Sequence, residues 1–140
     1  MKSIALIDHW TNYKGRFSEN SLPDAILVMD DLARKIAIKE FNSKVNIVQI
    51  KNYFMEGMLS NFFLIENKTF DFIFANINKN ILLSDLEVYN QCLNKNGHLF
   101  MSGFYLNDLK DIQKKAESLG LEYTIHNVDN EWVADKFTKT

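Results

Sequence analysis

Residues 70–83 read FDFIFANINKNILL, a short apolar run that ends at an asparagine and is followed at once by a helical pattern. The uncharged residues from Phe72 to Ala75 are typical of a strand buried on both faces, as in a parallel sheet covered by helices. In such sheets, ligands bind at the carboxyl ends of the strands. We therefore predict that Asn76 lies at this edge, where its side-chain amide can both donate and accept hydrogen bonds. Asn76 is the first candidate for a functional residue.

Apolar runs and helical patterns continue to alternate on both sides of this stretch. Strands are expected at residues 4–7, 25–29, 45–50, 70–75, 98–102, 121–127 and 131–137, and helices at 32–41, 81–93, 106–119 and within 53–65. Residues 94–97 are expected to form a turn, Gly120 to end the last helix, and residues 128–130 to join the final two strands as a hairpin. This order predicts an α/β fold with a doubly wound, mostly parallel sheet that ends in an antiparallel hairpin. The 140 residues contain no repeat or linker, so we expect a single domain over 1–140.

The composition is that of an ordinary globular protein, with 46% hydrophobic and 24% charged residues. A net charge of −2 without a basic cluster gives no electrostatic footprint for nucleic acid. No apolar run approaches the ~18 residues of a membrane helix, and no secretory signal opens the chain. One cysteine, Cys92, excludes an internal disulfide, and three scattered histidines offer no metal-ligand spacing. We therefore expect a cytoplasmic protein that binds no metal, nucleic acid or membrane.

Several short motifs, in this order and spacing, resemble one family. They are Ala75-Asn76-Ile77 with Asn80-Ile81-Leu82-Leu83, then Leu93-Asn94-Lys95-Asn96-Gly97, then Ser102-Gly103-Phe104-Tyr105, and last Trp132-Val133-Ala134 with Lys136-Phe137. The chain resembles the S-adenosylmethionine-dependent methyltransferases, and within them the C-terminal catalytic domain of the PrmA-type lysine methyltransferases of large-subunit ribosomal proteins. The resemblance implies a Rossmann-like, class I methyltransferase-like fold with S-adenosylmethionine as cofactor. It also implies a protein substrate or partner, such as a ribosomal protein.

The resemblance assigns Asn76 a catalytic role, because the family's asparagine after the fourth strand orients the substrate amine toward the methyl donor. The chemistry is consistent with this assignment. Methyl transfer to nitrogen depends on the alignment of donor and acceptor, and an uncharged amide can fix an amine by hydrogen bonds without protonating it. An alternative stays open, since Asn is also a favoured N-cap and Asn76 could simply cap the helix that follows.

Three further residues become candidates for cofactor binding by resemblance. Asp30 follows the second strand, where the fold's acidic residue accepts hydrogen bonds from the ribose hydroxyls, a task that suits a carboxylate. Asp8 matches the acidic residue after the first strand, and Asn52, after the third, could lie near the adenine. Asp30 could equally be a solvated turn residue or a helix cap, and the alignment at Asn52 is ambiguous by one residue.

The sequence departs from the family pattern after the first expected strand. A glycine-rich loop belongs there, because glycine lets the backbone pass close to the cofactor. Residues 8–15 instead read DHWTNYKG, with Trp10, Asn12 and Tyr13 where small residues are expected. Met1 also lies almost at the first strand, so we expect the family's N-terminal domain to be absent. Two functions therefore remain open: a protein N-methyltransferase, or a catalytically degenerate relative that binds a protein partner through this altered loop.

Two other chemistries fit the sequence poorly. A phosphoacceptor domain needs an aspartate after the third strand and a lysine after the fifth, but these positions hold Asn52 and Gly103. A serine nucleophile elbow needs a glycine two residues before the serine, and Ser102 has none. The methyltransferase fold therefore remains the better prediction.

Overall fold

The computed structural model describes residues 2–7, 22–28, 31–41, 46–49 and 69–140. These residues form one seven-stranded sheet with the strand order β3-β2-β1-β4-β5-β7-β6. Its strands are β1 (Ser3–Ile7), β2 (Ala25–Val28), β3 (Asn46–Gln49), β4 (Phe70–Asn76), β5 (Leu93–Tyr105), β6 (Leu121–Asp129) and β7 (Trp132–Lys139). The first five strands are parallel, whereas β7 runs antiparallel to both β5 and β6. The predicted α/β fold with its closing antiparallel hairpin is therefore confirmed.

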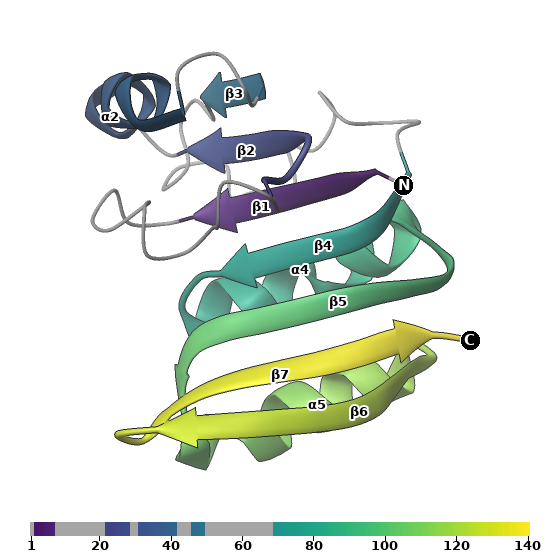
Figure 1. Ribbon diagram of the computed structural model, residues 1–140. Helices are drawn as coiled ribbons and strands as arrows, with labels where there is room; N and C mark the ends of the chain where they lie inside the picture. Colours follow the sequence, from purple (N-terminus) through teal and green to yellow (C-terminus); the bar gives the residue numbers. More distant parts are fainter. Residues whose placement is uncertain (1, 8–21, 29–30, 42–45, 50–68) are drawn as a thin grey trace.

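The helices include α2 (Asp31–Phe41), α4 (Lys79–Cys92) and α5 (Leu109–Ser118), the last preceded by the short 3-10 helix η2 (Leu106–Asp108). Figure 1 shows α4 and α5 on the same face of the sheet, behind β4, β5, β7 and β6. The main hydrophobic core lies between these two helices and the sheet. It includes Ile73 and Ala75 from β4, Leu86 and Tyr89 from α4, and Phe137 from β7.

Two expected boundaries in β5 are wrong. Residues 94–97, predicted as a turn, lie inside β5, where they form an irregularity between the pairs Phe70–Leu93 and Phe72–His98. A positive φ of 65° at Asn96 explains why turn-forming residues occur at this place. The strand also continues beyond Ser102 to Tyr105, because a second register shift at Gly103 lets it bend without ending.

The connection between β6 and β7 is also shorter than predicted. The turn consists of Asn130 and Glu131 alone, both with positive φ, 47° and 69°. Positive φ at both central residues is the signature of a type I′ turn, whose twist matches that of the flanking strands. Gly120, with φ 83°, follows the end of α5 as predicted.

Candidate functional site

The carboxyl ends of four parallel strands meet at one edge of the sheet. Ile7, at the end of β1, is the register partner of both Val28 in β2 and Asn76 in β4. Asn76 in turn pairs with Ser102 in β5. The arrowheads of β1, β2 and β4 in Figure 1 point to this edge, where the tip of the β6–β7 hairpin also lies. The fold therefore places Asn76 at the edge where α/β sheets bind ligands.

The backbone around Asn76 is held tightly against β5. The amide of Ile77 donates to the carbonyl of Ser102 at 3.0 Å. Gly103 has φ 95°, and a Cβ added there would lie 2.9 Å from the Ile77 carbonyl oxygen and 3.1 Å from Oδ1 of Asn76. Only glycine allows this close approach, because any side chain would collide with the Asn76–Ile77 backbone.

Asn78, rather than Asn76, is the N-cap of α4. Its Oδ1 accepts a hydrogen bond from the Ile81 amide at 3.3 Å, and its backbone is extended, as N-caps usually are. The alternative that Asn76 caps this helix is therefore wrong. The side-chain amide of Asn76, by contrast, makes no hydrogen bond within the described part of the chain.

A cleft of about 630 Å³ lies between the Asn76 segment and the hairpin. One side is formed by the ends of β4 and β5, and the other by the tip of the β6–β7 hairpin. The lining residues are Asn76, Asn78, Ser102, Gly103, Asn127, Val128, Asp129, Trp132, Val133 and Ala134. Amide, hydroxyl, carboxylate and indole groups therefore line one space large enough for a small molecule or a protein side chain.

A group of exposed aromatic and apolar side chains, here called the rim, includes two residues that line this cleft, Val128 and Trp132. The rings of Tyr105 and Trp132 have centroids 4.3 Å apart, although each residue remains about half exposed. The neighbouring Leu106 and Val128 are also exposed large apolar residues. Grouped apolar exposure of this kind marks an interaction site more often than scattered apolar residues do.

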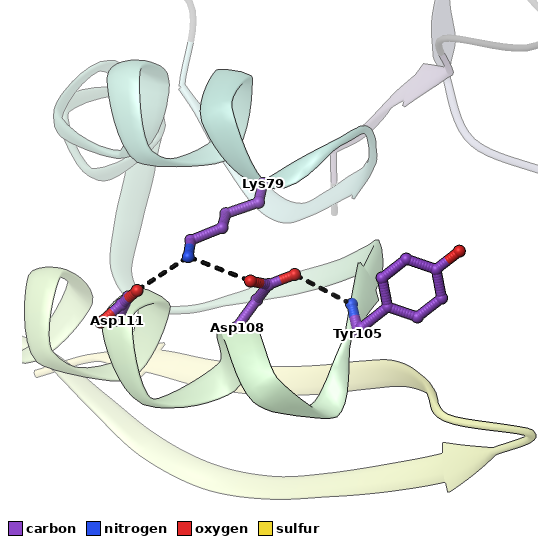
Figure 2. Close-up of polar contacts among 4 residues, drawn as sticks. All are labelled: Lys79, Tyr105, Asp108 and Asp111. Atoms are coloured by element: carbon purple, nitrogen blue, oxygen red, sulfur yellow. Dashed lines mark hydrogen bonds and ion pairs between the residues drawn. The ribbon is translucent and has the colours of Figure 1, made fainter.

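An ion-pair network connects the starts of α4 and α5 beside the cleft (Figure 2). The Nζ of Lys79 contacts Oδ1 of Asp108 at 3.0 Å and Oδ2 of Asp111 at 2.7 Å. The second oxygen of Asp108 accepts a long hydrogen bond, 3.4 Å, from the amide of Tyr105. The contacts with Asp111 and then Asp108 raise the pKa of Lys79, and Lys79 lowers the pKa of Asp111. Lys79 and Asp111 therefore each stabilise the charged form of the other.

Two acidic residues of the described chain are buried, Asp135 in β7 and Asp85 in α4. Asp135 in β7 is 3% exposed, and neither carboxylate oxygen has a hydrogen-bond partner among the described residues. Burial raises its pKa to about 7 and outweighs the nearby amides of Met101 and Asp135 itself, which lower it. Burial also raises the pKa of Asp85 in α4 to about 6, against the lowering effect of Ser84 and Tyr89. Asp135 carries the larger desolvation cost of the two.

The other predicted site residues, Asp8, Asp30 and Asn52, lie outside the described residues, as does the unusual 8–15 stretch. Several residues around the cleft were not predicted from the sequence as site residues. Trp132 and Gly103 stand only within the family motifs, and no role was predicted for Asp129 or Lys79. Only the turn-forming residues Asn127 to Asn130 signalled that the hairpin tip was polar.

The described residues contain no group of histidine, cysteine, aspartate and glutamate side chains that could hold a metal ion. None of their helices is both long enough and apolar enough to span a membrane.

Solved structures share the fold at low sequence identity. Ribosomal protein L11 methylase from Lactobacillus delbrueckii subsp. bulgaricus aligns with a TM-score of 0.74 and 18% identity, over 99% of this chain and 70% of that one. The fibrillarin pre-rRNA processing protein of Methanococcus jannaschii aligns with a TM-score of 0.75 and 11% identity, over 99% and 66%. These similarities establish the class I methyltransferase fold.

Relatives by sequence are more similar but match only part of their own length. The ribosomal protein L11 methyltransferase of Phocaeicola vulgatus is 48% identical over 98 residues, which are 69% of this chain and 34% of that protein. The one from Bacteroides thetaiotaomicron is 45% identical over 75 residues, 54% and 27% of the two chains. The chain thus spans about a third of the length of these relatives. The model of the family described as ribosomal protein L11 methyltransferase (PrmA) matches residues 25–140, and the chain belongs to this family.

Proposed function

We propose that this chain is an S-adenosylmethionine-dependent N-methyltransferase that modifies an amine of a protein, and that its substrate is a ribosomal protein in the cytoplasm. One observation carries the proposal: the amide of Asn76, which makes no hydrogen bond to the described residues, lines a cleft of about 630 Å³ at the carboxyl edge of the sheet. The family match over residues 25–140 and the names of the relatives support the choice of reaction and substrate.

The described edge fits a cofactor of this kind. The ends of β2, β1 and β4 are direct register neighbours at Val28, Ile7 and Asn76, so residues that follow these strands start from adjacent points. Asp8 follows β1 in sequence, and Asp30 follows β2. We propose that Asp30 binds the ribose hydroxyls, that Asn52 lies near the adenine, and that Asp8 is a further cofactor-binding residue. When bound, S-adenosylmethionine supplies an activated methyl group, so the protein's own chemical task is modest.

Asn76 serves this reaction by orienting the acceptor. Its carbonyl oxygen can accept an N–H of a neutral amine, which leaves the nitrogen lone pair free to form the new N–C bond. Because the side chain carries no charge, it does not stabilise the protonated, unreactive amine. The contact of Ile77 with Ser102 and the close packing of Gly103 hold the amide in place, and fixed alignment is the main source of rate in such a transfer.

The opposite wall of the cleft suits a lysine side chain. Asp129 lines the cleft and attracts a cation as it enters. Trp132 lines it as well, and an indole face packs well against an aliphatic stem and an ammonium group. A lysine that enters along this wall can therefore bring its amine toward Asn76 across the cleft.

Cofactor binding can be tested by calorimetric titration of the folded chain with S-adenosylhomocysteine, repeated on Asp30→Ala. Binding at micromolar ligand that is lost in the variant is the expected result. Absence of heat at millimolar ligand would refute the cofactor assignment.

The role of Asn76 can be tested by transfer of labelled methyl groups to ribosomal proteins from cells that lack the corresponding modification. Asn76→Ala should lower kcat by about 100-fold or more, because orientation is lost while the cofactor site is untouched. Asn80→Ala is the matched control, since Asn80 is an exposed asparagine in the first turn of α4, four residues after Asn76. Equal activity of the Asn76 variant and the control would contradict the assignment.

A protein-binding module without catalysis is the second candidate, and the exposed rim of Tyr105, Leu106, Val128 and Trp132 favours it. The two candidates give different results in the titration above. A module would bind no S-adenosylhomocysteine, yet its interaction with a protein would weaken in Trp132→Ala.

A further inference from the structure

Lys79 occupies an electrostatically unfavourable position. It is the first residue of α4, directly after the N-cap, and the first turn of this helix contains no acidic residue. A cation is destabilising at this end, because the helix dipole places partial positive charge there. The position is nevertheless filled by a lysine that is only 28% exposed at its side chain. Its partners must therefore compensate for the unfavourable location.

The partners belong to the next helix. Asp108 is the N-cap residue of α5 and Asp111 lies in its first turn, both favourable places for an acid. Lys79 contacts both at hydrogen-bond distance, 3.0 and 2.7 Å. We call these three residues the Lys79 clamp. Because α4 follows β4 and α5 follows β5, the clamp joins the two segments that leave the sheet at the cleft.

Each end of the clamp leads to one wall of the cleft. On one side, Lys79 follows the segment that contains Asn76 and the N-cap Asn78, both of which line the cleft. On the other side, Asp108 accepts from the amide of Tyr105, whose ring packs on Trp132 in the opposite wall. Figure 2 shows Lys79 reaching from one helix to the other, with Asp108 between it and Tyr105.

We infer that Lys79 is a positioning residue for methyl transfer: through Asp108 and Asp111 it sets the separation between the Asn76 amide and the Trp132 ring, against which Tyr105 packs, and these two groups align the acceptor side chain. The catalytic effect of Lys79 rests on the proposed function. The structural effect, that the Lys79 clamp controls the position of both walls of the cleft, is independent of the proposed function. The Lys79 side chain is partly shielded and contacts two acids at once, and such a network holds a geometry better than a single exposed pair does.

The experiment compares three variants of the intact chain: Lys79→Met, Lys79→Arg and Lys139→Met. Lys139 is the matched control, because its Nζ also bonds to α4, but at the far end, through the carbonyls of Asn90 and Leu93 at 2.6 and 2.9 Å. Both methionine variants therefore lose a lysine that ties α4 to its surroundings, and both should lower the melting temperature. Only one of them lies beside the cleft.

The first measurement is NMR of two signals that require no activity, the side-chain amide of Asn76 and the indole N–H of Trp132. Both should shift in Lys79→Met, return toward their wild-type positions in Lys79→Arg, and stay in place in Lys139→Met. Unchanged signals in Lys79→Met would overturn the inference. So would equal shifts in Lys139→Met, because the effect would then be general loosening of α4.

The second measurement is methyl transfer at a temperature where all variants are folded. Lys79→Met should lower kcat by about 10-fold or more, with the KM for the methyl donor little changed, and Lys79→Arg should recover most of the loss. Lys139→Met should keep wild-type kcat. Loss of activity in proportion to melting temperature in both methionine variants would refute a positioning role. Inactivity of the wild type would refute the proposed function, and the two NMR signals would then decide the inference alone.

Discussion

Replacing Asp135 by Asn should flatten the pH dependence of stability. The carboxyl group is 3% exposed and without a hydrogen-bond partner among the described residues, so the fold favours its protonated form. Burial raises its pKa from 3.8 to about 7. Between these two values the folded state holds a proton that the unfolded chain releases. Stability is therefore lost as the pH rises through this window and becomes level above the folded pKa.

The magnitude follows from the pKa difference. Each unit of pKa shift corresponds to about 1.4 kcal/mol. Between about pH 5 and about pH 8, the wild type should lose roughly 2 to 3 kcal/mol of unfolding free energy through Asp135. Asn has nearly the same shape and cannot ionise, so Asp135→Asn should lose that much less over the same interval. The cost of burying the Asn amide is the same at both pH values and cancels.

Urea unfolding of both chains at the two pH values measures this difference directly. Asp85, whose raised pKa of about 6 acts in the same direction, is common to both chains and also cancels. Asp71→Asn is the control, because the Asn94 side chain and the Lys2 backbone lower the pKa of Asp71. Its contribution is present above the unfolded pKa and is lost only as the pH falls below that value, so Asp71→Asn should keep the wild-type change in stability between the two pH values. An equal change in unfolding free energy with pH in the wild type and in Asp135→Asn would refute the reasoning. Asp135 would then be ionised in the folded state, for instance beside its register neighbour His126.

Three further substitutions test the fold around the cleft, each by thermal or urea unfolding. Gly103→Ala should destabilise by about 2 to 4 kcal/mol, because alanine would need a positive φ and its Cβ would collide with Ile77; a change below half that would contradict the contact. Glu131→Gly should raise the free energy of unfolding by about 1 kcal/mol, because the φ of 69° at this turn position causes no strain in glycine. A lower free energy of unfolding in this variant would argue against the type I′ turn. Lys139→Met should lower the free energy of unfolding by about 1 to 3 kcal/mol, because two carbonyls at the end of α4 lose a charged donor. An unchanged melting temperature would show that water replaces the lysine as the donor.

The order of elements could be predicted because each rests on a local pattern. The run from Phe72 to Ala75 suits a strand buried on both faces, and the sheet places it between β1 and β5. The edges of elements were harder to predict, because residues 94–97 have the composition of a turn. In the structure this stretch remains in β5, and Gly97 is needed because a Cβ there would lie 2.8 Å from the Asn94 carbonyl. Tertiary pairing overrode the local turn preference.

Only the part of the candidate site that lies at the end of a single strand could be predicted from the sequence. Asn76 follows β4 directly, so its place at the edge of the sheet could be inferred from the sequence. The opposite wall could not, because Trp132 reaches the cleft only through the antiparallel pairing of β7 with β5. The same holds for Lys79 and Asp108, which are 29 positions apart and meet only once two helices pack side by side. No local sequence pattern predicts such a contact.

The place of β7 in the sheet also sets the order in which the molecule can be built. This strand is made after β6, yet it lies between β5 and β6 and pairs with both. During synthesis, β6 therefore has no neighbour to join, and β5 keeps an unpaired edge until residues 132–139 are available. Unpaired edges invite association with other chains. We expect a nascent chain stopped at Asn130 to bind chaperones and aggregate, whereas a chain that extends nine residues further, to Lys139, can pair β7 with both β5 and β6.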